Sequence, residues 1–167
     1  MNLLGIESSS RKLSVGLMKE DSFSELHSEK INDTANSLPQ LSKKIIKNAS
    51  LSFEDLDAIC ISAGPGSFTG LRVGMSYAKG IAMALDIPIV PVSTFDSLAY
   101  NNFSKELSTL IYSHGNTFYI CEYSLDNGIL SKSSEPKSIS KKNALELSHN
   151  IVFNGCLLYT SPSPRDW

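Results

Sequence analysis

Hydrophobic and polar positions follow two different periods in the first hundred residues. Residues 3–6 form a continuous apolar run and residues 13–18 alternate apolar and polar positions, which predicts two strands. Residues 23–28 repeat the alternation more weakly and predict a third strand. Three consecutive strands with tight connections predict an antiparallel meander.

The period then becomes helical. Apolar residues recur three or four apart from Leu38 to Ala49, which predicts one apolar helix face. A buried strand at 58–63, a helix at 71–85, a short strand at 87–92 and a helix from 93 to about 101 follow. The prolines of the strand at 87–92 suggest a sheet edge or a strand end. The resulting order, βββαβαβα, favours an α/β fold in which crossover helices connect parallel strands.

The second half of the chain starts again with strands. Two strands and their turns occupy residues 107–130, a helix is expected at 140–149, and another strand begins at 151. This order predicts an N-terminal lobe over residues 1–104 and an incomplete second lobe of similar plan over residues 105–155.

The last twelve residues, 156–167, change abruptly to a Pro- and Ser-containing string without periodicity. The string resembles a translated sequencing-adapter artefact, so we interpret it as a non-native tail and exclude it from the fold. A genuine disordered tail is the alternative interpretation.

Composition indicates a globular protein. Hydrophobic residues make up 41% of the 167 residues, charged residues make up 19%, and the formal net charge is −2. This balance argues against a surface that coats nucleic acid. We therefore interpret three lysines of the first helix as a solvated face: Lys43, Lys44 and Lys47.

Location is suggested by what the sequence does not contain. No apolar run approaches the length of a membrane span, and the N-terminus lacks a basic leader, so we expect a cytoplasmic protein with no membrane partner. The cysteines form no CxxC pair, and buried free thiols are expected at Cys60 and Cys121.

The most specific motif is a glycine-rich loop between the strand at 58–63 and the helix that follows. Glycines permit close backbone approach, and a helix start presents free N–H groups, so an anion cradle is one interpretation and close packing is the other. The string lacks the Lys-Ser/Thr of a phosphate loop and the spacing of a dinucleotide fingerprint. The motif residues are Gly64, Pro65, Gly66, Ser67, Phe68, Thr69, Gly70 and Arg72.

Other candidate chemistry is sparse. The three histidines are widely separated and no pair has ligand spacing, so we expect no metal site. Glu7 ends the first strand and is the best lone carboxylate, either catalytic or a solvated or hydrogen-bonded strand-end acid. Asp33 is expected to cap the first helix.

Three segments together resemble the TsaB family: Ile6-Glu7-Ser8-Ser9, Gly-Pro-Gly-Ser-Phe-Thr-Gly-Leu-Arg at 64–72, and Pro91-Val92-Ser93-Thr94. The resemblance covers residues 2–102 and departs from the family pattern at 112–119. It implies an actin/hexokinase/Hsp70-like (ribonuclease H-like) fold. It also implies a non-catalytic subunit that supports TsaD, a threonylcarbamoyltransferase that forms threonylcarbamoyladenosine at position 37 of tRNA.

The resemblance further implies how such a subunit assembles. The partner would be a TsaD-like subunit, with a TsaE-like ATPase and tRNA reached only through the complex, and with a homodimer as another assembly. It implies no cofactor of its own and a nucleotide only at the complex junction. The helices at 38–49 and 71–85 would supply the partner interface, through Leu38, Leu41, Ile45, Met75 and Tyr77.

Two enzymatic alternatives stay open at this stage. The first is a metal-dependent threonylcarbamoyltransferase or peptidase-like enzyme of the same superfamily. The second is a small-molecule kinase of the same fold class. Binding of metal and nucleotide by the purified chain alone would favour an enzyme.

Overall fold

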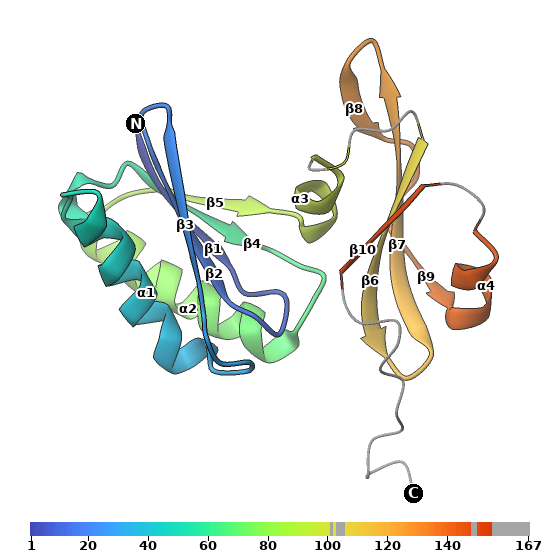
Figure 1. Ribbon diagram of the computed structural model, residues 1–167, viewed down its shortest axis with the longest axis horizontal. Helices are drawn as coiled ribbons and strands as arrows, with labels where there is room; N and C mark the ends of the chain where they lie inside the picture. Colours follow the sequence, from blue (N-terminus) through green and yellow to red (C-terminus); the bar gives the residue numbers. More distant parts are fainter. Residues whose placement is uncertain (101, 103–105, 148–149, 155–167) are drawn as a thin grey trace, which may run out of the picture. The chain divides into compact units, whose positions relative to one another are not determined.

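A computed structural model describes residues 1–100, 102, 106–147 and 150–154. Contacts divide the chain into two compact units, Met1–Thr94 and Phe95–Trp167 (Figure 1). The division falls ten residues before the expected boundary after residue 104. The reason is that Phe95 and Ala99 are buried in an apolar cluster of the second unit. The tail predicted from residue 156 onward lies outside the described residues.

The first unit contains a five-stranded sheet in the order β3-β2-β1-β4-β5. Both β1–β2 and β2–β3 pair antiparallel, which confirms the meander, and β4 pairs parallel with β1 and β5. As expected from its prolines, β5 is an edge strand. The strands are β1 (Asn2–Glu7), β2 (Ser14–Lys19), β3 (Ser22–His27), β4 (Ala58–Ser62) and β5 (Ile89–Val92).

Two helices, α1 (Thr34–Asn48) and α2 (Phe68–Leu85), cover one face of this sheet (Figure 1). The alternating inward positions of the strands and the apolar stripe of α1 form a single core, as helix-on-sheet packing requires. A short 3-10 turn, η1 (Phe53–Asp55), leads into β4. A capping box between Ser52 and Asp55 begins this turn.

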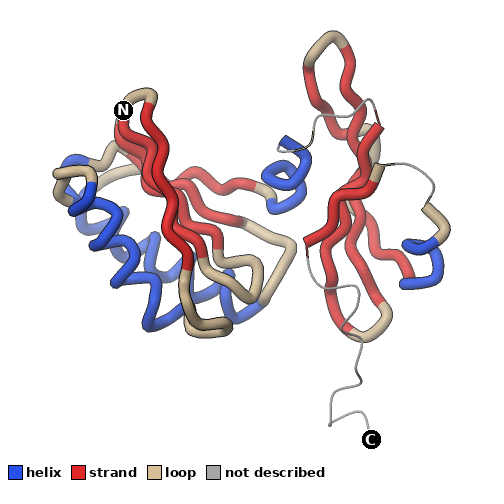
Figure 2. Tube along the Cα trace, in the orientation of Figure 1, coloured by secondary structure: helices blue, strands red, loops and turns tan. Residues whose placement is uncertain are grey.

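The second unit repeats this plan in part. Its sheet has the order β10-β6-β7-β8, with β10 parallel to β6, and the first unit has the corresponding order β4-β1-β2-β3 (Figure 2). The strands are β6 (Glu106–His114), β7 (Thr117–Asp126), β8 (Ile129–Lys132) and β10 (Ile151–Asn154). An additional strand that the sequence pattern did not predict, β9 (Lys137–Ser140), pairs with β7.

Two short helices cover the two faces of the second sheet. Helix α3 (Thr94–Tyr100) packs with odd-numbered positions of β6 and β7, such as Leu107, and α4 (Lys141–Leu145) packs with even-numbered positions, such as Leu110. Successive strand residues point to opposite faces, so the two clusters lie on opposite sides of the sheet. None of the helices described here is both long and apolar enough to cross a bilayer.

Candidate functional site

The glycine-rich loop connects β4 to α2 at the carboxyl end of the parallel strands. Gly64 has a φ of +94°, a conformation that favours glycine, and its carbonyl accepts a hydrogen bond from the Thr94 backbone N–H at 2.9 Å. The chain after β1 reaches the same edge at Ser8 and Ser9. The motif predicted from sequence is therefore one structural corner, assembled from the ends of β1, β4 and β5.

Three glycines allow α2 to lie directly against the Ser8–Ser9 corner. A Cβ atom at Gly66 would overlap the carbonyl oxygen of Ser9, and one at Gly70 would overlap that of Ser8. At Gly74 a Cβ would overlap the Ser8 hydroxyl. A side chain at any of the three would push the helix away from the strand ends, so close packing accounts for these glycines.

Ser67 fixes the start of α2. Its backbone N–H donates to the Ser9 carbonyl at 2.6 Å, and its hydroxyl accepts from the Gly70 N–H at 3.2 Å. This is an N-cap, which satisfies an amide that has no partner within the helix. It also explains why α2 begins at Phe68 and not at the predicted Leu71. The geometry of the loop favours the packing interpretation over the anion cradle.

Backbone N–H groups donate the hydrogen bonds of this corner, whereas three of its hydroxyls make none with the described residues. The hydroxyls of Ser8, Ser9 and Thr94 are buried and have no hydrogen-bond partner among the described residues. Backbone contacts supply the polar links instead, such as the bond of 3.1 Å from the Ser8 N–H to the Ser62 hydroxyl. The precise fit of α2 against the strand ends is therefore the feature that a substitution would disturb first.

The two candidate acids have structural roles. The Glu7 carboxylate accepts from the Ser9 backbone N–H at 2.6 Å, which confirms a hydrogen-bonded strand-end acid. Asp33 is the N-cap residue of α1, and its carboxylate accepts from the side chains of Asn36 and Ser37 and from no backbone amide. Within the described parts of the chain, no three His, Cys, Asp or Glu side chains gather as a metal site requires.

Phe68 and Arg72 project from the first turns of α2. The Phe68 side chain is 70% exposed, and the Arg72 guanidinium lies 4.3 Å from the centre of its ring. A cation held over an aromatic face is a preorganised surface group that combines charge with apolar area. These two motif residues contribute to the surface of the first unit, whereas Gly66 and Gly70 contribute to its internal packing.

The five residues expected at a partner interface do not share one environment. Leu38 and Ile45 are 0% and 1% exposed and belong to the core of the first unit, so their side chains cannot face a partner. This corrects that part of the expectation, because the apolar stripe of α1 is the stripe that packs on its own sheet. Leu41, Met75 and Tyr77 are partly buried against the same core. Burial raises the pKa of the Tyr77 hydroxyl.

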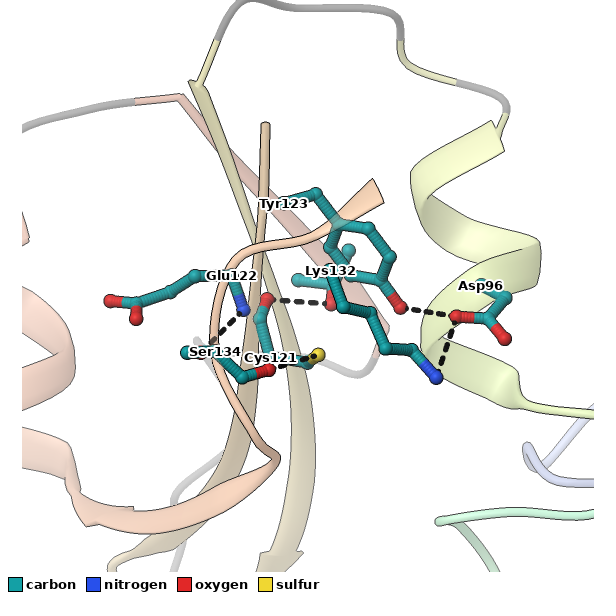
Figure 3. A network of polar contacts seen from close by, with 7 residues as sticks. Asp96, Cys121, Glu122, Tyr123, Lys132 and Ser134 are labelled. Atoms are coloured by element: carbon teal, nitrogen blue, oxygen red, sulfur yellow. Dashed lines mark hydrogen bonds and ion pairs between the residues drawn. The ribbon is translucent and has the colours of Figure 1, made fainter. Parts of the chain in front are cut away.

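A polar network in the second unit was not predicted from the sequence (Figure 3). Asp96 of α3 accepts a hydrogen bond of 2.5 Å from the Tyr123 hydroxyl and pairs with Lys132 at 3.1 Å. Tyr123 and Lys132 are cross-strand partners in the hairpin of β7 and β8. Asp96 lies on α3, 27 residues before Tyr123, so no local spacing could have shown that it joins them. The network attaches α3 to the sheet of the second unit.

Buried ionisable groups beside this network favour their neutral forms. Burial, reinforced by the hydrogen bond to Asp96, raises the pKa of Tyr123. Burial also raises the pKa of the Cys121 thiol beside this network and of the Cys60 thiol on β4 of the first unit. Both cysteines are free; Cys121 is buried as expected, whereas Cys60 is only partly buried. Raised thiol pKa values describe inert cysteines rather than nucleophiles.

Comparison with known proteins decides the family. A family model described as TsaD: tRNA N6-adenosine threonylcarbamoyltransferase matches residues 24–154. A TsaB protein of Buchnera aphidicola subsp. Schizaphis graminum, a tRNA threonylcarbamoyladenosine biosynthesis protein, is 30% identical over 149 residues, which are 86% of this chain and 70% of the relative. This chain belongs to the TsaB family.

Other TsaB relatives extend the comparison. The TsaB protein of Bacillus subtilis is 29% identical over 151 residues, 88% of this chain, and the match spans 66% of the relative's length. The solved structure of YeaZ from Pseudomonas aeruginosa superposes with a TM-score of 0.76 at 25% identity, over 84% of this chain and 69% of that one. The expected fold class is thereby confirmed.

Proposed function

We propose that this TsaB-family chain is a non-catalytic subunit that binds a TsaD-like threonylcarbamoyltransferase. In that role it supports formation of threonylcarbamoyladenosine at position 37 of tRNA. Several relatives are named tRNA threonylcarbamoyladenosine biosynthesis protein TsaB, which supports the assignment to this pathway.

The non-catalytic part of the proposal rests on the structural contacts that the residues of the family motif make. Its glycines allow helix packing, its serine caps α2, and Glu7 bonds to the Ser9 amide at the adjoining strand end. These residues stabilise the fold, whereas a catalytic site needs side chains that point toward a bound substrate. The match to a TsaD family model is the observation that favours the alternative, an active transferase.

The proposal also covers assembly and location. The chain would work in the cytoplasm, would reach tRNA and a TsaE-like ATPase only through the complex, and would contribute no cofactor of its own. A nucleotide would bind at the junction with the catalytic subunit. A homodimer is the competing assembly when the catalytic subunit is absent.

A complementation experiment tests the proposal. A bacterial strain is depleted of its own TsaB protein and expresses the catalytic subunit from the source organism, with or without this chain. We expect threonylcarbamoyladenosine in digested tRNA, measured by mass spectrometry of nucleosides, to recover only with both proteins. Recovery with this chain alone, in a strain that also lacks the catalytic subunit, would establish the transferase alternative instead.

A further inference from the structure

Two residues, Asn127 and Gly128, make the turn between β7 and β8, in a hairpin that extends from the second sheet (Figure 1). Both have positive φ, 50° at Asn127 and 80° at Gly128. This is the backbone of the two-residue hairpin turn that the Asn-Gly sequence favours. A second Asn-Gly pair, at 154–155, lies partly outside the described residues.

The same pair of residues is chemically reactive. Asparagine is thermolabile because the backbone nitrogen of the next residue can attack its side-chain amide carbon, and a glycine hinders that attack least because it has no side chain. Asn127 and Gly128 are both exposed, and beyond its chain neighbours no heavy atom lies within 4 Å of the position a Cβ on Gly128 would take. The Gly128 N–H donates to no backbone carbonyl among the described residues. Solvent therefore reaches both the attacking nitrogen and the amide.

The closed hairpin is what restrains this reaction. Closing a five-membered ring requires rotation about ψ of Asn127, and a two-residue turn between paired strands restricts that rotation. Strand β8 has only four residues, of which Leu130 alone is buried, and it lies at the end of the strand order. Such a strand can separate locally while the rest of the unit stays folded.

A side-chain contact at the other end of β8 opposes this opening. Lys132 lies opposite Tyr123 on β7, and its ammonium group lies 3.1 Å from the Asp96 carboxylate on α3. The ion pair is partly exposed, so its loss would make opening easier without removing core contacts. The rate of reaction at Asn127 should therefore depend on Lys132, although the two residues do not touch.

We propose that Asn127 is a site of spontaneous deamidation whose rate is set by opening of the β7–β8 hairpin. The Gly128 backbone nitrogen bonds to Cγ of Asn127, the Cγ–Nδ2 bond breaks, and ammonia leaves with the proton that the Gly128 nitrogen gives up. Solvent water then opens the succinimide at either of its two carbonyls, which leaves aspartate or isoaspartate at residue 127. Nothing is oxidised or reduced, and the inference is independent of the proposed function.

The isoaspartyl product would alter the hairpin. Isoaspartate carries the backbone through the former side-chain carbonyl and adds a methylene group to it, so the turn no longer consists of two standard residues. Turn length fixes register, which here places Lys132 opposite Tyr123. A shifted β8 would separate Lys132 from Asp96 and weaken the attachment of α3 to its sheet.

The test follows residue 127 in the folded full chain at physiological temperature. Wild type, K132Q and the control K137Q are incubated at pH 6 and pH 9, and wild type is also incubated in urea below its unfolding transition. Lys137 is the matched control because it also forms an ion pair with β7, through Glu122, but lies on β9. Peptide mapping by mass spectrometry then separates the asparaginyl, aspartyl and isoaspartyl forms of each site.

We expect aspartate and isoaspartate to accumulate at residue 127 faster than at Asn116, which is followed by a β-branched threonine in the turn between β6 and β7. The reaction should be faster at pH 9 than at pH 6, because base assists removal of the Gly128 amide proton. K132Q should accelerate it about two- to fivefold, the effect that loss of a partly exposed ion pair has on an opening equilibrium. K137Q should react at the wild-type rate, and urea should accelerate the reaction.

The consequence for the fold is measured on the purified isoaspartyl form. Its thermal unfolding midpoint should lie about 2–4 °C below that of wild type, the shift that loss of one such contact produces in a chain of this size. N127D is the control, because it adds the negative charge but keeps a two-residue turn that Asp-Gly also favours. N127D should unfold close to wild type.

An Asn127 that reacts no faster than Asn116, or at the same rate at both pH values, would overturn the assignment of the site. Equal rates in K132Q and K137Q, or a wild-type rate that urea does not change, would overturn control by the hairpin. An isoaspartyl form that unfolds at the wild-type midpoint would overturn the effect on α3.

Discussion

Gly74 shows how single residues determine the corner at the end of β1. It lies in the second turn of α2, where the helix passes the Ser8 hydroxyl and the Ile61 side chain at close range. Gly80 lies six residues further along the same helix, and beyond its chain neighbours and the local helix backbone no heavy atom is within 4 Å of the position its Cβ would take. The two glycines therefore separate the cost of overpacking from the general effect of glycine in a helix.

Gly74→Ala should lower the free energy of unfolding by about 1–3 kcal/mol, because the added methyl group overlaps Ser8. Gly80→Ala is the matched control and should raise it by about 0.5–1 kcal/mol through helix propensity alone. Urea denaturation followed by circular dichroism measures both. If Gly74→Ala is as stable as Gly80→Ala, the packing role assigned to the motif glycines is wrong.

The raised pKa of Tyr123 predicts how the free energy of unfolding depends on pH. The folded state holds the Tyr123 proton because its pKa is raised, whereas the unfolded chain loses that proton at about pH 10. The unfolded state then binds fewer protons than the folded one, so this group's contribution to stability is present below pH 10 and is lost as pH rises further.

Tyr123→Phe should therefore have two effects. At pH 7 it should cost about 1.5 kcal/mol, because the hydrogen bond to the Asp96 carboxylate is lost. Between pH 9 and 11 its free energy of unfolding should fall less steeply than that of wild type. Denaturant titrations at several pH values measure both; parallel pH profiles would contradict the raised pKa of Tyr123.

At the scale of elements, α2 depends on its N-cap. Ser67→Ala removes the hydroxyl that accepts from the Gly70 amide and should destabilise the chain by about 1 kcal/mol. Ser76→Ala changes an exposed serine within the same helix and should be neutral or slightly stabilising. The thermal unfolding midpoints of the two variants measure this difference. A Ser67→Ala midpoint that equals that of Ser76→Ala would show that the cap does not hold the start of α2.

The elements of the first unit were predictable because each has a clear period and clear boundaries. The alternation in β2 and the three-to-four spacing in α1 each match an observed element. The start of α2 was missed by one turn, because Ser67 caps the helix from within a loop whose glycines suggested a turn. The pattern could not show that Leu38 and Ile45 of the apolar stripe of α1 are used by its own sheet.

The second unit was less predictable because its contacts are long-range. Strand β9 has only four residues, of which one is half-buried and three are exposed. It is therefore too short to show a recognisable alternation of apolar and polar positions. Helix α3 belongs to the second unit because Phe95 and Ala99 are buried in its core and Asp96 accepts a hydrogen bond from Tyr123. A local sequence window cannot include these contacts, whereas the glycine motif identified the corner of the first unit from nine consecutive residues.

For the whole molecule, the family assignment and the geometry point to the same division of labour. The TsaB relatives are named for threonylcarbamoyladenosine biosynthesis, and in this chain the motif loop is committed to packing. The surface over α1 and α2 combines basic and exposed apolar side chains without acids. Both observations support the proposed role, in which the chain holds a partner and leaves the reaction to it.

Reconstitution of tRNA modification with purified proteins tests this central claim most directly. The catalytic subunit from the source organism, its ATPase, tRNA and an activated threonylcarbamoyl donor are combined with and without this chain. Our account predicts that threonylcarbamoyladenosine forms rapidly only when this chain and the catalytic subunit are both present. Formation by this chain without the catalytic subunit, or an undiminished rate when this chain is omitted, would contradict it.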